Sequence, residues 1–158
     1  MPRFNPTAKT RWYLVPTVAS VTAPTVANIT AGTNLTPYMR SYSGFAFEPG
    51  DTDVSDLANL RDKSVPGTSP IVASSIQLYS GDLVGDAEET TRAAFVEGAS
   101  SHIVRVYWGA PVAAGKCDVF PVLIKGINTD TVGRGDAMTY TVGLATNSTP
   151  GLYVAIAA

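Results

Sequence analysis

The sequence has 158 residues and a net charge of −2, and only 15% of its residues are charged, against about 25% in an ordinary soluble domain. The length predicts one domain, 1–158, that buries about two-thirds of its unfolded surface. The acidic balance excludes a general attraction for nucleic acid, and apolar runs shorter than ~20 residues predict no membrane span. Sparse charge beside 45% hydrophobic residues predicts an outer surface largely covered by other subunits.

The N-terminal part begins with an arm. Residues 1–8 contain two prolines, which predicts an extended segment, and they lack the apolar run of a signal peptide. Lys9 to Val15 is rich in β-forming residues and predicts the first strand. Residues 25–31 predict a turn or two of helix that Gly32 ends, with a plain loop as the alternative.

The later segments alternate between strand and turn patterns. Residues 35–48 predict one long strand with a bend near Gly44, because glycine tolerates unusual backbone angles. Further strands are predicted at 71–80, 101–108, 116–128, 136–147 and 151–156, the last two forming a hairpin through Thr149 and Pro150. Pro121 has no N–H to donate to a ladder, so its N–H side should face an edge or a bulge.

The long connection at about 49–70 differs from the rest, because it is polar and rich in proline, glycine and aspartate. A connection of this length in a compact domain usually carries a function. Scattered apolar residues within it predict a loop that docks on another subunit. The residues expected to make that contact are Asp51, Asp53, Val54, Asp56, Leu57 and Leu60.

The same stretch begins like a calcium-binding loop, with acidic residues at alternate positions. The sixth position of such a loop requires glycine but holds Asp56, and the twelfth requires glutamate but holds Asp62. We therefore expect a solvated acidic loop and no metal site.

The stretch Asp86–Glu97 is the one that predicts a long helix. Asp86 is a good N-cap, Glu89 completes a capping-box spacing, and Gly98 supplies a stop. Glu88 and Arg92 are spaced for an i,i+4 ion pair. One face of this helix has small residues and one aromatic, which predicts close packing on a sheet, chiefly through Ala94 and Phe95. The residues of this face are Ala87, Thr90, Thr91, Ala94 and Phe95. Val96 lies off this face, as an ordinary exposed valine or as a contact with another subunit.

His102 and Cys117 are the only residues of their types and are the first candidates for a nucleophilic pair. If the strand 101–108 pairs with the strand that starts at Lys116, Cys117 lies opposite about Trp108, and His102 lies roughly 20 Å away. We therefore expect a strand-end histidine and a semi-buried thiol instead of a catalytic pair.

The sequence contains no phosphate-binding loop, dinucleotide fingerprint, nucleophile elbow or paired CxxC motif. Arg134-Gly135-Asp136 spells an adhesion tripeptide, but its place between two strands predicts a hairpin turn. We therefore expect no catalytic residues, no cofactor and no metal.

In order and spacing, the chain resembles the phage major tail proteins, the tube subunits of long non-contractile tails common in phages of actinobacteria. The likeness covers essentially the whole chain, and its motifs are structural. They are KTRWYLVP at 9–16, ITAGTNLTP at 29–37, Ser43-Gly-Phe45, DVSDL at 53–57, the helix, and the Gly/Thr-rich C-terminal hairpins.

The resemblance implies a mainly β subunit, sandwich-like or barrel-like, with one flanking helix at about 86–97. It implies hexameric rings that stack into a tube around a tape measure protein. The length, polarity and apolar residues of the loop at about 49–70 predict that it contacts the next ring. Tail terminator and tip proteins are further partners, and DNA passes through the lumen without specific binding. Such a protein belongs to the virion tail and is assembled in the cytoplasm of the bacterial host.

Two other classes remain open from the sequence. A head decoration or head–tail joining subunit would share this composition but would bind preformed capsid instead of itself. A cytosolic binding module or enzyme would need a pocket with convergent polar groups, and the sequence shows none.

Overall fold

Ten strands and two short helices make up the computed structural model, which describes residues 9–46, 51–53, 64–66, 73–81, 83–130 and 133–158, with the backbone alone at 51–53 and 64–66. The expected arm at 1–8 and most of the 49–70 loop lie outside the described residues. The helices are α2 (Val26–Thr30) and α3 (Ala87–Ala93). The strands are β1 (Arg11–Val15), β2 (Thr33–Asn34), β3 (Met39–Ser43), β4 (Asp51–Asp53), β5 (Ser64–Pro66), β6 (Ser74–Tyr79), β7 (Ser100–Val106), β8 (Lys116–Thr129), β9 (Thr139–Thr146) and β10 (Gly151–Ala155).

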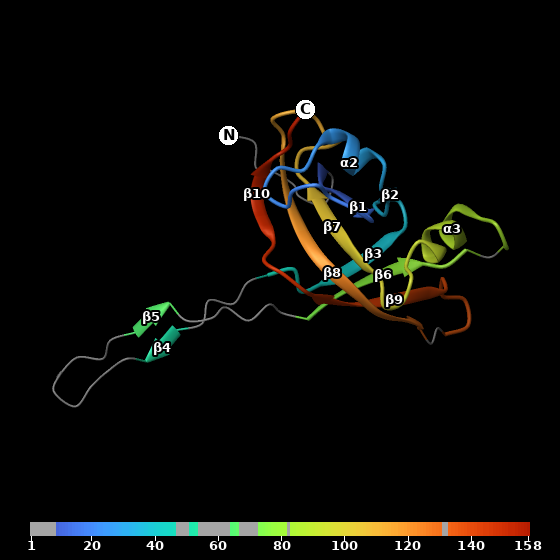
Figure 1. Cartoon of the computed structure of the whole chain (residues 1–158). Helices are drawn as coiled ribbons and strands as arrows, with labels where there is room; N and C mark the ends of the chain where they lie inside the picture. The colour runs from blue at the N-terminus through green and yellow to red at the C-terminus, as the bar shows by residue number, and fades with distance from the viewer. Residues whose placement is uncertain (1–8, 47–50, 54–63, 67–72, 82, 131–132) are drawn as a thin grey trace, which may run out of the picture.

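The predicted mainly β fold is confirmed. Seven strands form an antiparallel sheet in the order β2-β1-β7-β8-β9-β6-β3, and β10 joins it by pairing with β8. β4 and β5 form a separate two-stranded sheet, which stands apart from the large sheet (Figure 1). The loop predicted around them therefore contains a hairpin.

Strand β8 is the longest and changes partner along its length. Its first residues, 116–119, pair with β10, and its later residues, 122–129, pair with β9. Pro121 falls between these two pairings, so its missing N–H interrupts neither ladder. β7 lines the other side of β8 as far as Leu123.

The predicted C-terminal hairpin is wrong. β9 and β10 do not pair with each other, because both pair with β8, at different parts of its length. The register of β7 and β8 also differs from the expected one, since Cys117 lies opposite Val106 instead of Trp108. A long turn, 107–115, takes up the difference.

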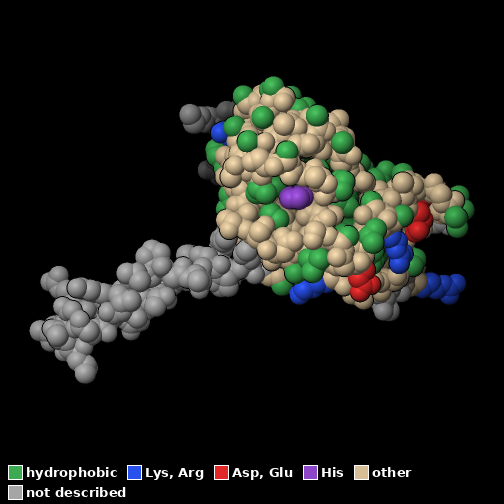
Figure 2. Space-filling model, in the orientation of Figure 1, with side chains coloured by type: hydrophobic (Ala, Val, Ile, Leu, Met, Phe, Trp, Pro, Cys, Tyr) green, Lys and Arg blue, Asp and Glu red, His purple; other side chains and the backbone are tan. Residues whose placement is uncertain are grey.

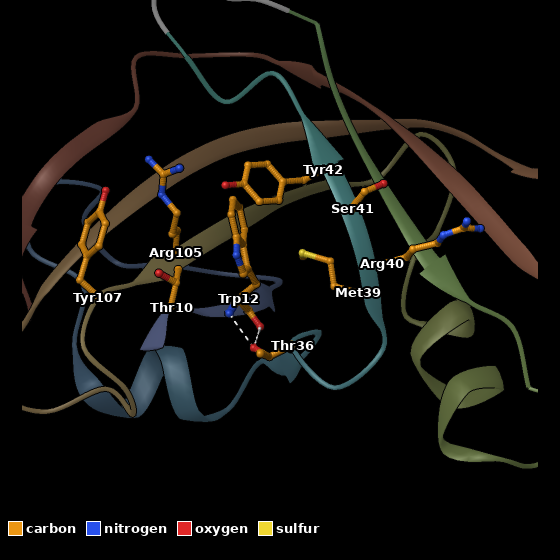
Figure 3. Close-up of a pocket in the computed structure, with 9 residues that line it drawn as sticks. All are labelled: Thr10, Trp12, Thr36, Met39, Arg40, Ser41, Tyr42, Arg105 and Tyr107. Atoms are coloured by element: carbon orange, nitrogen blue, oxygen red, sulfur yellow. Dashed lines mark hydrogen bonds between the residues drawn. The ribbon is translucent and has the colours of Figure 1, made fainter. Parts of the chain in front are cut away.

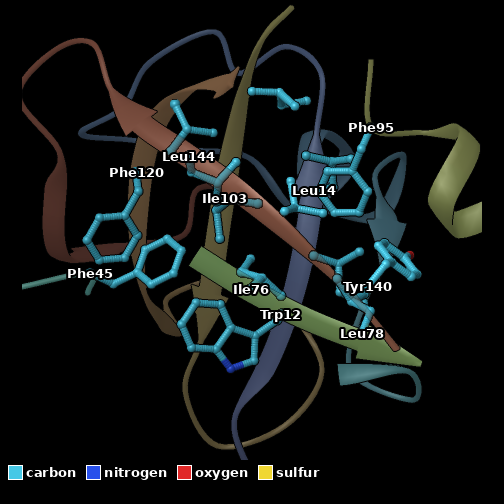
Figure 4. Close-up of a cluster of buried hydrophobic side chains, with 14 residues drawn as sticks. Trp12, Leu14, Phe45, Ile76, Leu78, Phe95, Ile103, Phe120, Tyr140 and Leu144 are labelled. Carbon is cyan, nitrogen blue, oxygen red and sulfur yellow. The ribbon is translucent and has the colours of Figure 1, made fainter. Parts of the chain in front are cut away.

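Two apolar cores form on the two faces of β1 and β7. Successive side chains of each strand point to opposite faces. Trp12, Leu14 and Ile103 therefore enter the first core, whereas Tyr13 and Val104 enter the second. Figure 4 shows the first core, where strands β6 and β9 add Ile76, Leu78, Tyr140 and Leu144. The second core contains Tyr13, Val15, Ile29, Val104, Val106 and Cys117, with α2 packed over β1.

Helix α2 confirms the short helix predicted at 25–31. Thr25 is its N-cap: its hydroxyl accepts a bond from the Asn28 N–H (3.1 Å), and the Asn28 side chain accepts one from the Thr25 N–H (3.5 Å). Gly32 follows because a Cβ there would lie 2.7 Å from the Leu14 carbonyl oxygen. Ile29 is fully buried and anchors the helix in the second core.

Helix α3 is shorter than the predicted 86–97. Asp86 occupies the N-cap position, but its carboxylate accepts a bond from the Leu83 N–H (3.1 Å) and does not cap the helix. Glu88 and Arg92 form no ion pair among the described residues, because Arg92 donates to the Thr129 hydroxyl (3.1 Å) and lies over the Tyr140 ring. The predicted capping box and ion pair are therefore wrong.

The helix ends early because its last turn has 3₁₀-type hydrogen bonds, between residues three positions apart. The Ala94 and Phe95 N–H groups donate to residues three positions back, Thr91 and Arg92, which turns Phe95 into the first core. Phe95 is 3% exposed and Ala94 packs beside it, whereas Val96 is 59% exposed.

The strand predicted at 35–48 is broken, with a turn at 35–38 before β3. The bend near Gly44 is confirmed: Gly44 has φ +81° and Phe45 has φ +57°. A Cβ at Gly44 would meet the Ala73 carbonyl oxygen at 2.7 Å, and the Phe45 N–H donates to the Ser74 hydroxyl (3.0 Å). The bend thus directs Phe45 into the first core.

We expect Phe95→Ala to lower the free energy of unfolding by about 3 kcal/mol, because it leaves a cavity in the first core. Urea denaturation followed by fluorescence measures the change. The neighbouring exposed residue provides the control, since Val96→Ala should change stability by less than about 0.5 kcal/mol. Equal, small effects of both variants would show that Phe95 does not anchor the segment after α3.

Candidate assembly surfaces

His102 and Cys117 do not form a catalytic pair. The register places His102 opposite Pro121, four positions along β8 from Cys117, about 13 Å at ~3.3 Å per residue. Burial raises the pKa of Cys117 to about 12, so the thiol stays protonated, and burial lowers the pKa of His102. The cysteine is a packing residue of the second core.

Strands β3, β6 and β9 present a polar face on the side away from the first core. Ile76, Leu78 and Val142 point inward and are fully buried, and the side chains between them are small or polar. We call this surface the polar sheet face; its residues are Ser41, Ser75, Gln77, Thr141 and Gly143. The Ser41 hydroxyl donates to the Gln77 side-chain oxygen (3.1 Å), which joins β3 to β6 across it.

Asp130 organises one end of the polar sheet face. Its carboxylate accepts bonds from Gln77 Nε2 (2.8 Å) and from the hydroxyls of Thr139 (2.9 Å) and Thr141 (2.9 Å). These bonds, the one from Gln77 foremost, and the nearby Arg40 cation lower the pKa of Asp130. Asp136 lines the same hollow as Arg40 and Asp130, so this end of the face has no surplus of positive charge.

Two strand edges border the polar sheet face without a partner among the described residues. Of the strands that the structure describes, β3 pairs with β6 alone, so none of them occupies its outer edge. Beyond Ile124, whose N–H donates to the Ala99 carbonyl oxygen (3.0 Å), β8 pairs with β9 alone. We call 125–129 the distal part of β8. Open edges of this kind are templates for pairing with another chain.

A groove of about 420 Å³ runs along the outer edge of β3, between it and β1. Across it Trp12 and Tyr42 face each other with ring centroids 4.7 Å apart, while Arg40 points away (Figure 3). The ends of the curved sheet thus meet through aromatic side chains, and no ladder joins β1 to β3 in the described chain. On the β1 side, a side chain takes the place of a neighbouring strand, because the Thr36 hydroxyl accepts a hydrogen bond from the Trp12 N–H (2.8 Å).

A buried carboxylate, Asp118, lies where β7, β8 and β10 meet. It is 2% exposed, and it accepts bonds from the Arg105 guanidinium, the Tyr107 hydroxyl (2.5 Å) and the Tyr153 N–H (2.7 Å). Arg105 and Asp118 are direct cross-strand partners. Burial and the bond to Asp118 raise the pKa of Tyr107 to about 12. All members of this cluster are therefore held in fixed positions.

A family model for phage tail tube proteins matches residues 1–158. The chain belongs to the phage tail tube protein family. This is a family of structural tail proteins, and its members are components of the virion tail.

Solved structures show the same fold. One is a chain of the sheath/tube terminator of the PVC extracellular contractile injection system in the extended state, with TM-score 0.60, 12% identity, and coverage of 94% of this chain and 96% of that one. Another belongs to the baseplate of the anti-feeding prophage, with TM-score 0.54, 8% identity, and coverage of 94% and 93%. No curated protein sequence matches the chain.

The tail tube fold accounts for some of the sequence-predicted residues. Asp51 and Asp53 lie in β4, whereas Val54, Asp56, Leu57 and Leu60 lie outside the described residues. The tripeptide 134–136 forms the predicted hairpin turn between β8 and β9, with Gly135 at φ +95° and the Gly133 N–H donating to the Asp136 carboxylate (3.2 Å). In the described residues no group of side chains has the composition of a metal site, and no helix is long and apolar enough to cross a membrane.

Sequence reasoning missed the roles of Asp118 and Asp130 and the places of the two open edges in this member of the tail tube protein family. The observed register of β7 and β8 differs by two residues from the expected one and sets Arg105 opposite Asp118. Testing this second register on the sequence would have indicated the buried pair, because it places opposite charges across the two strands. Figure 2 shows a face with few charged side chains, in which the histidine lies among uncharged groups. Charge gathers at the lower margin of this view, so the low charge of the composition is also a property of this surface.

We expect Asp118→Ala to lower the free energy of unfolding by roughly 3–5 kcal/mol, because it leaves the Arg105 cation half-buried without its partner. Thermal or chemical denaturation at neutral pH provides the measurement. Glu97→Ala removes an exposed carboxylate and should change stability by less than about 0.5 kcal/mol. An Asp118 variant as stable as this control would contradict the central role of the cluster.

Proposed function

We propose that the chain is the major tail tube subunit, whose hexameric rings stack into the channel for DNA ejection. The observation that carries this proposal is the pair of open edges on either side of one four-stranded sheet, made of β3, β6, β9 and the distal part of β8. Tape measure, terminator and tip proteins are the partners that complete such a tail, assembled in the cytoplasm of the host.

The strand directions favour closure of a ring. The four strands alternate in direction, so β3 of one subunit runs antiparallel to the distal β8 of a neighbour related by rotation about a common axis. Joining these edges in every subunit produces a continuous antiparallel barrel without a free edge. The contact is heterologous, since two different surfaces meet, and rotation closes it into a ring.

The polar sheet face is the surface that such a barrel turns towards its lumen, because the opposite face of the same strands packs on the first core. Its small and neutral side chains offer no row of cations to phosphate groups. Where charge occurs, Arg40 lies near Asp130, and Lys125 of the distal part of β8 is a single exposed cation next to Gly143. A wall of this composition allows DNA to pass without holding it, because tight binding requires lysine and arginine contacts to phosphates.

A tube terminator is the second candidate function. The likeness to a chain of a sheath/tube terminator favours it, although a likeness at 12% identity concerns the fold. A terminator closes a tube with one ring, whereas a major subunit adds ring upon ring. Electron microscopy of the purified protein therefore separates the two, since elongated tubes support the major subunit and isolated rings support the terminator.

We expect Ser41→Lys with Ser43→Lys to abolish rings while the subunit stays folded, because lysines on an edge strand oppose pairing with another strand. Native mass spectrometry and negative-stain microscopy, over a range of concentrations and with an assembly initiator, give the readout, and circular dichroism checks the fold. Thr149→Lys, in the exposed turn before β10, is the matched control and should assemble normally. Normal rings from the β3 variant would show that this edge is not the ring contact.

A deletion that joins Pro49 to Pro70 should leave the subunit folded and unable to polymerise. β4 and β5 pair only with each other among the described strands, and an isolated two-stranded sheet is marginally stable in water. A hairpin of this kind gains stability by docking on another subunit, here across rings. Tubes of normal length from the deleted protein would refute the inter-ring role.

Assembled protein should not bind duplex DNA, even at low salt. Acidic residues outnumber basic ones, 13 to 11, so the chain as a whole repels phosphate groups. Sedimentation of tubes with labelled duplex, at low and moderate salt, measures the association. Tight binding with a steep salt dependence would instead indicate a basic groove created by assembly.

A further inference from the structure

The turn after β7 and strand β10 together expose an aromatic and aliphatic surface. Trp108 is 53% exposed and Tyr153 is 55% exposed, and their rings pack edge to face with centroids 6.2 Å apart. The same two segments also expose Val112, at 59%, and Leu152, next to Tyr153 in the chain, at 46%. We call these four residues the aromatic end. Exposed Trp and Tyr side chains in one cluster are typical of the energetic centre of an interface.

The backbone of the aromatic end adopts an unfavourable conformation at two residues. Trp108 has φ +60° and Tyr153 has φ +53°, a left-handed conformation that is unfavourable for bulky residues. The Asp118 cluster holds Tyr153, since the Asp118 carboxylate accepts a bond from the Tyr153 N–H, and the Tyr107 ring lies 5.9 Å from the Tyr153 ring, tilted by 58°. Strain of this kind persists where the surrounding structure fixes it, and it concentrates at functional sites.

One cation lies on the aromatic end, and two further basic residues lie near it along the chain. Lys116 lies 5.4 Å from the centre of the Tyr153 ring, and the Lys9 carbonyl oxygen accepts a bond from the N–H of Gly109, next to Trp108. Arg11 lies opposite Val106, the last residue of β7 before this turn. The acidic side chain within the cluster, Asp118, is buried and already bonded. This end therefore presents apolar groups together with the positive charge of Lys116.

The α3 end has the opposite charge. The loop before α3 exposes Leu83 and Val84, at 66% and 105%, and the helix begins with Asp86, Glu88 and Glu89. Strand β7 separates the two ends: it starts shortly after α3 and finishes just before Trp108, seven residues or about 20 Å apart. In Figure 1, α3 lies at one extremity, and β10 and the C-terminus lie towards the other.

We propose that the aromatic end of one subunit docks on the α3 end of the copy in the next ring. This rests on the proposed function, since it presumes stacked rings, and it assigns the stacking contact to named residues. Charge complementarity selects a second copy as the occupant: the basic aromatic surface meets an acidic apolar one, at opposite ends of the same chain. A contact between two different surfaces of identical subunits repeats in one direction and produces a linear stack.

The test compares tube growth of full-length variants. Trp108→Asn and Tyr153→Asn replace the aromatic side chains with asparagine, a residue that tolerates the left-handed backbone conformation. We expect rings to form and the critical concentration for tube growth to rise by about tenfold or more, as for the loss of an interface hot spot. Tyr79→Asn, at another exposed aromatic, should leave growth unchanged. Tubes of normal length at the normal concentration from both aromatic-end variants would overturn the proposal.

A charge exchange makes the pairing specific. Lys116→Glu and Glu88→Lys should each shorten tubes, and the double variant should restore them towards wild-type length. Failure of the exchange to restore growth would overturn the assignment of α3 as the partner. Failure of the wild-type protein to form any ring would instead refute the proposed function, so the two failures are distinguishable. Reduced thermal stability of the Trp108 variant with normal tubes would show that the aromatic end serves its own subunit.

Discussion

The structure depends on strand β8, which takes part in both halves of the fold. Its first residues lie between β7 and β10 over the second core, and its later residues leave β7 and continue beside β9 over the first. A strand covered on both sides and both faces must be apolar almost throughout, and residues 117–122 are all buried. Pro121 is tolerated because it stands between the two pairings. On the other side of β8, β7 begins at Ser100, opposite Leu123, so the edge of β8 beyond that residue is open among the described strands, and one strand contributes both to the core and to an open edge.

Open edges normally expose a protein to aggregation, and a subunit that must polymerise cannot simply cover them. The chain separates the two requirements. At β1 the Thr36 hydroxyl occupies the Trp12 backbone and blocks further pairing, whereas at β3 a groove leaves the edge accessible. The aromatic contact between Trp12 and Tyr42 holds β3 in place without using its backbone groups. The edge is thus supported from the side and remains available to another strand.

The sequence indicated the fold class, the short helix at α2, the bend at Gly44 and the turn at 134–136, because each depends on local chemistry of capping, positive φ or turn residues. It did not indicate the ends of α3 or the pairing of β9 and β10. The α-helix ends before Phe95 because burial of its side chain in the first core is favourable. Strand β10 pairs with β8, more than 30 residues earlier in the chain, and local sequence patterns do not indicate such a pairing. The buried Asp118 was equally hidden, since a charged residue in an alternating strand has the pattern of a surface position until its cross-strand partner is known.

The two kinds of contact inferred for the tube differ in chemistry, and the difference has a consequence for assembly. Ladder hydrogen bonds between β3 and β8 depend on backbone groups and are directional, so they fix the geometry of a ring. The contact between the aromatic end and α3 combines apolar area with exposed charges, which salt screens over about 10 Å at 0.1 M. A ring joined by ladders is therefore expected to persist at salt concentrations that weaken stacking. Such an order allows rings to add one at a time to a growing end, because the ring is complete before its weaker axial contacts select a position.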